Sequence, residues 1–388
     1  MQELSTIAMP EPIAAETPRP PRAPGRALRV GRCLASGLAW AFGAASLGVG
    51  LAVVSALPVV QFLGLGYFLE ASGRVARSGR FRDGIFGIRR AGRVGGLVAG
   101  AWLSLLPLKL VASLASSAEL IDPGGAIARV WRAALFALAG LTAAHVAASC
   151  LRGGRLRDFA WPPGTLLWLG RRLGRPGLYA EARDSTWDFA GSLRLPRYFR
   201  VGLLGFAGTL AWLAVPVTLL LLGRRWPPVG LAGALAMAWV VPPLPFLQAR
   251  FAAEGRFRAL FERRAVMARF RRAPWAFALG LLATLAAAVP LYLLKIEMVP
   301  REAAWVPGLL FVAFLAPARL LCGWAYARAD RRELPRHWAW RWPARLGAIP
   351  VVLAYAAIVF LAQYTSWGGS WSLYEQHAFL LPVPFGLE

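Results

Sequence analysis

Long apolar runs separated by charged segments follow one another along this chain. A helix rises about 1.5 Å per residue, so about 20 apolar residues cross the roughly 30 Å hydrocarbon core of a membrane. Seven runs have this length: 93–114, 130–150, 201–222, 229–250, 275–296, 306–327 and 345–364. The pattern predicts an all-α fold, a polytopic integral membrane bundle of about seven spanning helices.

An earlier apolar run, residues 34–70, is too long for a single crossing. It carries no charge before its last residue, and as one helix it would be roughly 55 Å long. Gly48, Gly50 and Pro58 offer break points near its middle. We interpret 34–70 as an N-terminal helical hairpin that returns to its starting side. One span followed by an interfacial helix is the alternative.

The basic residues indicate which side of the membrane each loop occupies. Lys and Arg collect on the cytoplasmic side of membrane proteins. If 34–70 returns and every other run crosses once, 36 of the 44 basic residues fall on one side and five on the other. We therefore expect a cytoplasmic N-terminus and a C-terminus on the opposite side.

The same pattern divides the chain into three parts. Residues 1–33 are rich in Pro and Arg and are expected to form a disordered cytoplasmic tail. Residues 34–364 form the transmembrane helical domain, in which the polar segment 151–200 is expected to lie at the cytoplasmic interface. Residues 365–388 form a tail on the far side.

The sequence motif Gly-Arg-apolar-Arg occurs three times, each time after a long apolar run. It begins at Gly79, Gly154 and Gly255, and we call the three segments elbows. We expect cytoplasmic amphipathic elbow helices that lie in the headgroup plane; in the third, Phe257 and Phe261 fall on one helical face. Arginines near an anionic leaflet are attracted to it, although they also serve simply to set topology. The headgroup-contact candidates are Arg80, Arg82, Arg155, Arg157, Arg256, Arg258, Arg263 and Arg264.

Composition agrees with a lipid environment and changes the meaning of the charge. The chain is 57% hydrophobic and 16% charged, its mean hydropathy is +0.51, and its net charge is +25. A soluble protein this basic would be a candidate for nucleic-acid binding. Here the basic residues lie between runs of spanning length, so the expected partner is a bilayer with anionic headgroups on its cytoplasmic side, and no nucleic acid.

Ionisable residues inside the runs are the first candidates for a site, because burying them in a bilayer is costly. Lys109 lies near the outer end of its run and can extend to the interface. His145 lies deeper, where it is expected to bond a neighbouring helix or, alternatively, to relay protons. Arg319 follows Pro317 about two turns from the inner face and is the strongest candidate. No carboxylate lies inside the seven runs, which counts against a proton-coupled transporter.

A stripe of carboxylates lies in the 151–200 segment. Glu181, Asp184 and Asp188 are spaced i, i+3 and i+7, so a helix would place them on one face. Such a stripe is a weak candidate for a metal site or for acid–base chemistry. We favour ion pairs with neighbouring arginines: Arg183, Arg194, Arg197 and Arg200.

Other motifs for chemistry are missing from the sequence. Cys33, Cys150 and Cys322 have no C-x-x-C spacing, and the three histidines are far apart. No hydrolase, metalloprotease or phosphate-loop motif occurs in the required setting. We therefore predict no catalytic residue, no metal and no cofactor.

Two blocks carry a resemblance to a group of proteins. GLYAEARDSTWDFAGSLRLPRYFRVG, together with GYFLEASGRVARSGRFRDG, resembles uncharacterised multi-pass membrane proteins of planctomycete-type bacteria, over most of residues 58–365. The resemblance implies a bacterial cytoplasmic (inner) membrane, and in such a membrane the charge bias places the C-terminus in the periplasm. It implies no activity and no site residue.

Three functions remain open at the level of sequence. The first is a non-enzymatic scaffold or accessory factor that contacts anionic lipids through its elbows. The second is a small-molecule permease, which the prolines within the apolar runs favour. The third is a membrane-embedded lipid-modifying enzyme, and the acidic stripe is the only sequence feature that supports it.

Overall fold

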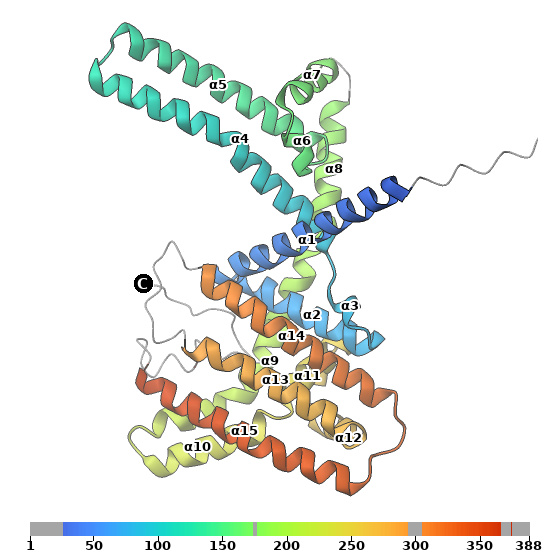
Figure 1. Ribbon diagram of the computed structural model, residues 1–388. Helices are drawn as coiled ribbons and strands as arrows, with labels where there is room; N and C mark the ends of the chain where they lie inside the picture. The colour runs from blue at the N-terminus through green and yellow to red at the C-terminus, as the bar shows by residue number, and fades with distance from the viewer. Residues whose placement is uncertain (1–25, 174–176, 294–304, 366–373, 375–388) are drawn as a thin grey trace, which may run out of the picture. The chain divides into compact units, whose positions relative to one another are not determined.

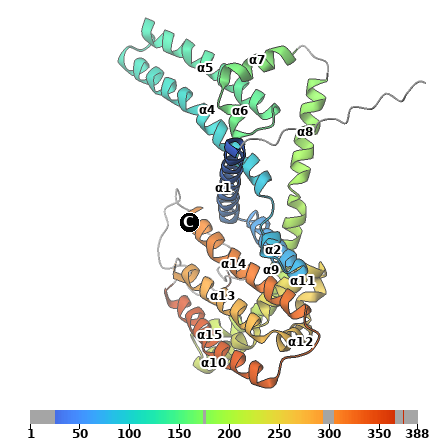
Figure 2. The same ribbon diagram turned by 45° about the vertical axis from the view of Figure 1, so that its right-hand side comes forward.

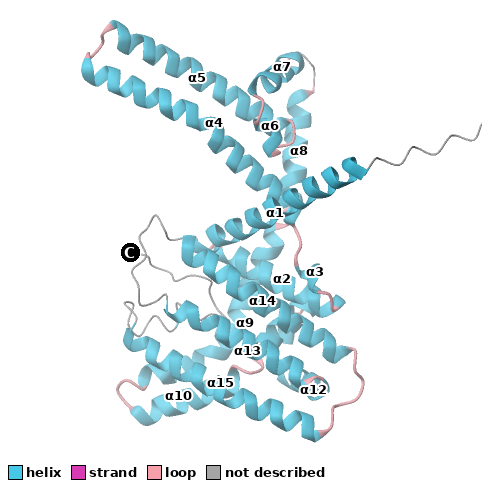
Figure 3. Ribbon diagram, in the orientation of Figure 1, coloured by secondary structure: helices cyan, strands magenta, loops and turns pink. Residues whose placement is uncertain are grey.

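The computed structural model describes residues 26–173, 177–293 and 305–365, together with Tyr374. In this part of the chain every regular element is a helix, and there is no strand (Figure 3). The elements are α1 (Arg26–Ala56), α2 (Gln61–Ser78), α3 (Phe81–Gly84), α4 (Ile88–Ile121), α5 (Ala126–Leu151), α6 (Leu156–Phe159), α7 (Pro162–Arg172), α8 (Leu178–Ser192), α9 (Leu195–Leu222), α10 (Pro227–Val240), α11 (Leu244–Glu254), η1 (Phe257–Phe261), α12 (Arg263–Arg272), α13 (Pro274–Leu293), α14 (Trp305–Asp330) and α15 (Trp338–Thr365).

Seven helical segments within the described residues are long and apolar enough to cross a membrane. They lie in α1, α4, α5, α9, α13, α14 and α15. The predicted all-α polytopic class is therefore confirmed. One predicted run, 229–250, differs from expectation: it is divided between α10 and α11, which bend by 42° at a short break. The break holds Pro242 and Pro243, which cannot donate the backbone bonds that continue a helix.

The N-terminal run 34–70 is divided at one of its three expected break points, Pro58, and not at Gly48 or Gly50. α1 continues through Gly48 and Gly50 to Ala56, and the chain turns at Pro58 and Val59 before α2 begins. A glycine inside a helix costs only about 1 kcal/mol, whereas proline removes a hydrogen bond and clashes. The run is thus one helix of spanning length followed by α2.

The first helix begins earlier in the chain than we expected, so less of the N-terminal segment can be a tail. Residues 26–33, which we assigned to a disordered tail, form the first turns of α1. Their Ala, Leu and Arg residues have high helix propensity, and the helix begins directly after Pro24 and Gly25. Residues 1–25 and most of the predicted far-side tail 365–388 lie outside the described residues.

α2 is largely enclosed within the bundle. Twelve of its 18 residues are buried, and it packs against α9, α11 and α14. The contact with α9 is made backbone to backbone at Gly66 and Gly202. A Cβ atom on Gly66 would lie 1.8 Å from the carbonyl oxygen of Tyr198, and one on Gly202 would lie 1.9 Å from that of Phe62. Small residues thus allow the close approach that is typical of membrane helices.

The remaining helices of the bundle enclose one large apolar core. α13 lies between α14 and α15, as Figures 1 and 2 show, and α10 packs against α9 and α15. Fully buried side chains from these helices include Leu213, Met237, Leu244 and Val359. The core therefore joins helices from residue 195 to residue 365 into one packed unit with α2.

The helices α4 to α7 form a second group of contacts. α4 pairs with α5, α6 packs against both, and α7 packs against α5. The outer surfaces of α4 and α5 leave Leu110, Leu120 and Phe136 largely exposed. Contiguous exposed apolar surface of this kind marks contact with lipid or another apolar partner.

The three elbows share one backbone conformation. Gly79, Gly154 and Gly255 all have positive φ values, of 72°, 65° and 71°, which glycine adopts at no steric cost. In each case the following arginine is extended and a helix of one turn begins after it: α3, α6 and η1. The repeated Gly-Arg-apolar-Arg motif therefore corresponds to a repeated turn that follows the end of a helix. In the third elbow the expected single amphipathic helix is divided into η1 and α12.

Candidate functional site

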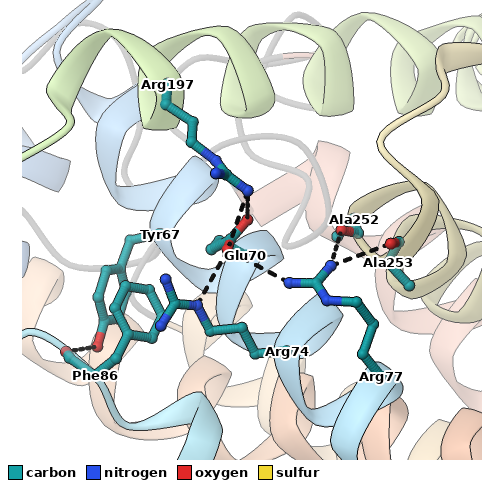
Figure 4. Close-up of polar contacts among 8 residues, drawn as sticks. All are labelled: Tyr67, Glu70, Arg74, Arg77, Phe86, Arg197, Ala252 and Ala253. Carbon is teal, nitrogen blue, oxygen red and sulfur yellow. Dashed lines mark hydrogen bonds and ion pairs between the residues drawn. The ribbon is translucent and has the colours of Figure 1, made fainter.

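A buried carboxylate on α2 gathers three arginines. Glu70 is 3% exposed. Its oxygens lie 3.1 Å from Nε of Arg74, 3.5 Å from Nη2 of Arg77 and 3.2 Å from Nη2 of Arg197. Figure 4 shows the three guanidinium groups converging on it, two from α2 and one from α9. Both carboxylate oxygens are thus held by positively charged donors.

The arginines extend this cluster to two further parts of the bundle. Nη1 of Arg77 donates to the carbonyl oxygens of Ala252 and Ala253, at 3.0 and 3.1 Å, near the C-terminal end of α11. The guanidinium of Arg74 lies 3.7 Å from the ring centroid of Phe86, and that position is favourable for a cation. Glu70 therefore ties α2 to α9, to α11 and to the turn before α4.

This cluster was not predicted from the sequence, although a signal existed. Glu70 ended the apolar run 34–70 and was treated only as a boundary. Arg74 and Arg77 follow it at i+4 and i+7, which places all three residues on one helical face. Its long-range partner, Arg197, was expected to pair with the acidic stripe.

Arg319, the strongest candidate from the sequence, lies in the core between α9, α11 and α14. It is 1% exposed. Its Nη1 donates to Oε1 of Gln248; Nε2 of Gln248 in turn donates to Thr209, and the Thr209 hydroxyl donates to the carbonyl of Gly205, 2.7 Å away. A chain of polar side chains thus holds the guanidinium in one orientation.

The other nitrogens of Arg319 have no such partners. Nε and Nη2 are buried and make no hydrogen bond, and no ion pair to Arg319 occurs in the described part of the chain. Leaving a buried donor unsatisfied costs about 1–3 kcal/mol, and more for a charged group. Arg319 is therefore a positive group whose binding capacity the protein uses only in part.

A groove beside α12 is lined by arginines and aromatic side chains. Its volume is about 970 Å³. The indole Nε1 of Trp212 donates to the carbonyl of Leu260 at 2.9 Å, and the guanidinium of Arg263 lies 3.5 Å from the Trp239 ring centroid. Burial lowers the pKa of Arg263 from its ordinary value. The lining residues are Trp212, Trp239, Phe261, Glu262, Arg263, Arg264, Ala265, Met267, Ala268 and Arg271.

The groove has a net positive lining. Its one carboxylate, Glu262, is paired with Arg250. Among the described residues, no carboxylate pairs with Arg263, Arg264 or Arg271. The groove therefore presents guanidinium groups next to indole and methionine side chains.

Of the eight predicted headgroup contacts, Arg263 and Arg264 line this groove. The structure does not bring the others into it. Arg256 pairs with Glu254, and Arg157 lies 3.9 Å from Asp158. The rest are exposed at their own elbows: Arg80, Arg82, Arg155 and Arg258.

The acidic stripe lies on α8 and lines a shallow surface hollow, as its spacing predicts. Glu181, Asp184 and Asp188 share the hollow with Arg93. In the described residues no group of three His, Cys, Asp or Glu side chains is placed to hold a metal ion.

The ion pairs of the stripe differ in part from those expected. Asp184 pairs with Arg183, as predicted, at 2.9 Å, but Glu181 pairs with Arg172 at 3.1 Å. Arg197 is wrong as a partner, because α9 begins at Leu195 and turns that side chain toward Glu70 on α2.

His145 and Lys109 have different surroundings. His145 is buried, and its Nε2 lies 3.2 Å from the carbonyl oxygen of Phe159. It therefore joins α5 to α6, as expected of a histidine that bonds a neighbouring helix. Lys109 is exposed on α4, and no contact of its side chain suggests a site.

These features define a multi-pass helical membrane protein in which, among the described residues, Arg319 is almost fully buried with two nitrogens unsatisfied and a basic groove lies beside α12. No protein family, curated protein sequence or solved structure gives a significant match to this chain. The functional argument therefore depends on the chemistry of the two arginine sites.

Proposed function

We propose that this protein is a non-enzymatic scaffold or accessory factor of a bacterial inner membrane that binds anionic phospholipid headgroups in the groove beside α12. One observation carries this proposal: three guanidinium groups, none of which pairs with a carboxylate of the described residues, line a groove together with indole, phenyl and thioether side chains. A phospholipid has the matching chemistry, since its phosphate is anionic and its glycerol and acyl chains are apolar.

The surroundings of the groove support a lipid rather than a soluble anion as its ligand. Tryptophan is enriched where membranes meet water, and Trp212 and Trp239 belong to helices α9 and α10 that enter the apolar core. Arg264 and Arg271 lie on α12, between the apolar helices α11 and α13. Each arginine near an anionic leaflet contributes about 1 kcal/mol, screened by salt.

Contacts at one end of the bundle support the proposed cytoplasmic rim. Arg77 of α2 bonds the end of α11, as described above, and Nη2 of Arg331 donates to the carbonyl of Ser78 at 2.9 Å. The backbone N–H of Arg336 donates to the carbonyl of Arg271 at 2.8 Å. The arginine-rich segments after α2, α11 and α14 are thus next to one another, which the expected topology requires.

Binding of short-chain lipids to the purified full-length protein in neutral detergent tests the proposal. We expect dihexanoyl-phosphatidylglycerol to bind more tightly than dihexanoyl-phosphatidylcholine. Changing Arg263, Arg264 and Arg271 together to Gln removes about 3 kcal/mol at most, so we expect a loss of affinity of roughly ten- to a hundredfold at low salt.

A matched control changes three other basic residues to Gln: Lys109, Arg129 and Arg225, which are exposed and do not line the groove. This variant has the same net charge and should keep the parental affinity. Equal affinity of the parent for both lipids, or equal loss in both triple variants, would contradict a lipid site at α12.

A small-molecule permease is the second candidate function. Two observations favour it: α10 and α11 form a helix broken at its middle, and Gln248, which holds Arg319, lies on α11. Broken helices line the substrate sites of many transporters. A permease must first recognise its solute in the core of the bundle, where Arg319 lies.

A further inference from the structure

The two unpaired nitrogens of Arg319 belong to one edge of its guanidinium group. Nη1 lies on the side of the side-chain stem and is used by Gln248. Nε and Nη2, which are both buried without a hydrogen-bond partner in the described part of the chain, point in the opposite direction and lie in the same plane. We call this pair the free edge of Arg319. It is the edge that forms two parallel hydrogen bonds with a carboxylate or phosphate.

The surrounding side chains hold this edge in place without hydrogen-bonding to it, among the residues that the structure describes. The chain from Arg319 through Gln248 to Thr209 ends on a carbonyl of α9, so the position of the guanidinium is determined by three helices. A fixed donor pair loses little rotamer freedom when a ligand arrives, and such preorganisation favours binding.

Protein groups near Arg319 do not supply the missing acceptors. Cys322 lies one turn further along α14, but its sulfur is 3.2 Å from the hydroxyl of Thr284 and 3.6 Å from the carbonyl of Gly280. Glu70, the buried carboxylate of α2, is already held by three arginines. Within the described residues, therefore, no acceptor bonds the two donors of the free edge, and no carboxylate pairs with the positive charge of Arg319.

We propose that the free edge of Arg319 is a binding site for an anion that offers two coplanar oxygens, a carboxylate or a phosphate group, in the core between α9, α11 and α14. Such an anion satisfies both donors and neutralises the buried charge at once. The proposal uses none of the groove residues, so it stands independently of lipid binding at α12.

Thermal unfolding of the full-length protein in neutral detergent, followed by tryptophan fluorescence, tests this site. Sodium acetate, sodium phosphate and sodium chloride are compared at equal ionic strength. We expect acetate or phosphate to raise the transition temperature in a saturable manner, relative to chloride, because ligands that bind only the folded state stabilise it. The same transition in all three salts would overturn the proposal.

Two variants assign the effect to the free edge. Arg319→Lys keeps the charge but loses the paired donors, so the half-saturating concentration should rise by about tenfold or more. Gln248→Glu places a carboxylate of nearly the same size beside Arg319 and should abolish the response while the protein stays folded. An unchanged response in Gln248→Glu would contradict the proposal even if Arg319→Lys fails to fold.

A third experiment distinguishes a soluble anion from a lipid phosphate as the ligand of Arg319. Dihexanoyl-phosphatidylglycerol is added to the parent and to the variant with Arg263, Arg264 and Arg271 changed to Gln. A soluble ligand predicts that this variant keeps its full response to acetate or phosphate. A response to the lipid alone, lost in Gln248→Glu but kept in the groove variant, identifies the anion at Arg319 as a lipid phosphate.

Discussion

Two buried ionised side chains, Glu70 and Arg319, differ in how far their hydrogen-bonding capacity is used. Both oxygens of Glu70 have guanidinium partners from α2 and α9. Among the described residues Arg319 has one hydrogen-bond partner, Gln248, and Nε and Nη2 have none. A fully satisfied charge stabilises the packing of its helices, whereas a partly satisfied one is typical of sites that act on a ligand. We therefore assign a structural role to Glu70 and a binding role to Arg319.

Replacing the satisfied charge tests the structural role. Glu70→Gln leaves three guanidinium groups facing one another around a neutral amide. Breaking a buried pair costs about 3–5 kcal/mol, but Arg74, Arg77 and Arg197 are partly exposed. We therefore expect a loss of about 2 kcal/mol in the free energy of unfolding, measured with denaturant in detergent.

The exposed pair between Glu181 and Arg172 provides the comparison. Exposed ion pairs contribute about 0–1 kcal/mol, so Glu181→Gln should change stability by less than about 0.5 kcal/mol. If both substitutions have the same effect, Glu70 has no special part in holding α2.

At the level of elements, the sequence predicted those features that depend on local composition. Apolar length located the spanning helices, and Pro58 ended α1, because proline acts within its own turn. The contacts of α2 were not predictable in this way. Glu70 meets Arg197 across 127 positions of the chain, and Gly66 meets Gly202 through a contact that no local pattern encodes. Periodicity shows that a face is buried, but not against which helix it is buried.

The contact between α2 and α9 depends on the absence of a side chain at Gly66. Gly66→Ala would place a Cβ atom 1.8 Å from the Tyr198 carbonyl, so the helices must move apart. Overpacking of this kind costs about 1–3 kcal/mol, and we expect a corresponding fall in stability in denaturant unfolding.

Gly140 in α5 is the matched control, because a Cβ atom there would meet nothing within 4 Å. Gly140→Ala should be neutral, or stabilising by up to about 1 kcal/mol through helix propensity. A similar loss in both variants would show that the close approach at Gly66 does not govern stability.

For the whole molecule, the sequence established the class while leaving the function open. The charge asymmetry of the loops predicts one topology, with the elbows on the cytoplasmic side. It follows from the preference of arginine for that side. The structure adds contacts among the segments after α2, α11 and α14, and these contacts agree with the same arrangement.

Labelling of single cysteines in intact spheroplasts with an impermeant thiol reagent tests this topology. Cys33, Cys150 and Cys322 are first replaced by Ala or Ser. We expect labelling of Arg129→Cys and Arg225→Cys, which are exposed between predicted outer helix ends. Ser185→Cys and Arg264→Cys should be labelled only after the membrane is permeabilised. Labelling of Arg264→Cys in intact cells would show that the elbows face outward.

The position of α2 has a consequence for how the chain is made. α2 is not among the helices apolar enough to cross a membrane alone, and the arginine on α9 that completes its charge cluster is synthesised more than a hundred residues later. A nascent chain that ends before α9 therefore holds Glu70 with only its own helix's cations. We expect α2 to settle between α9, α11 and α14 only after all three helices have been made, that is, after the ribosome has passed residue 330.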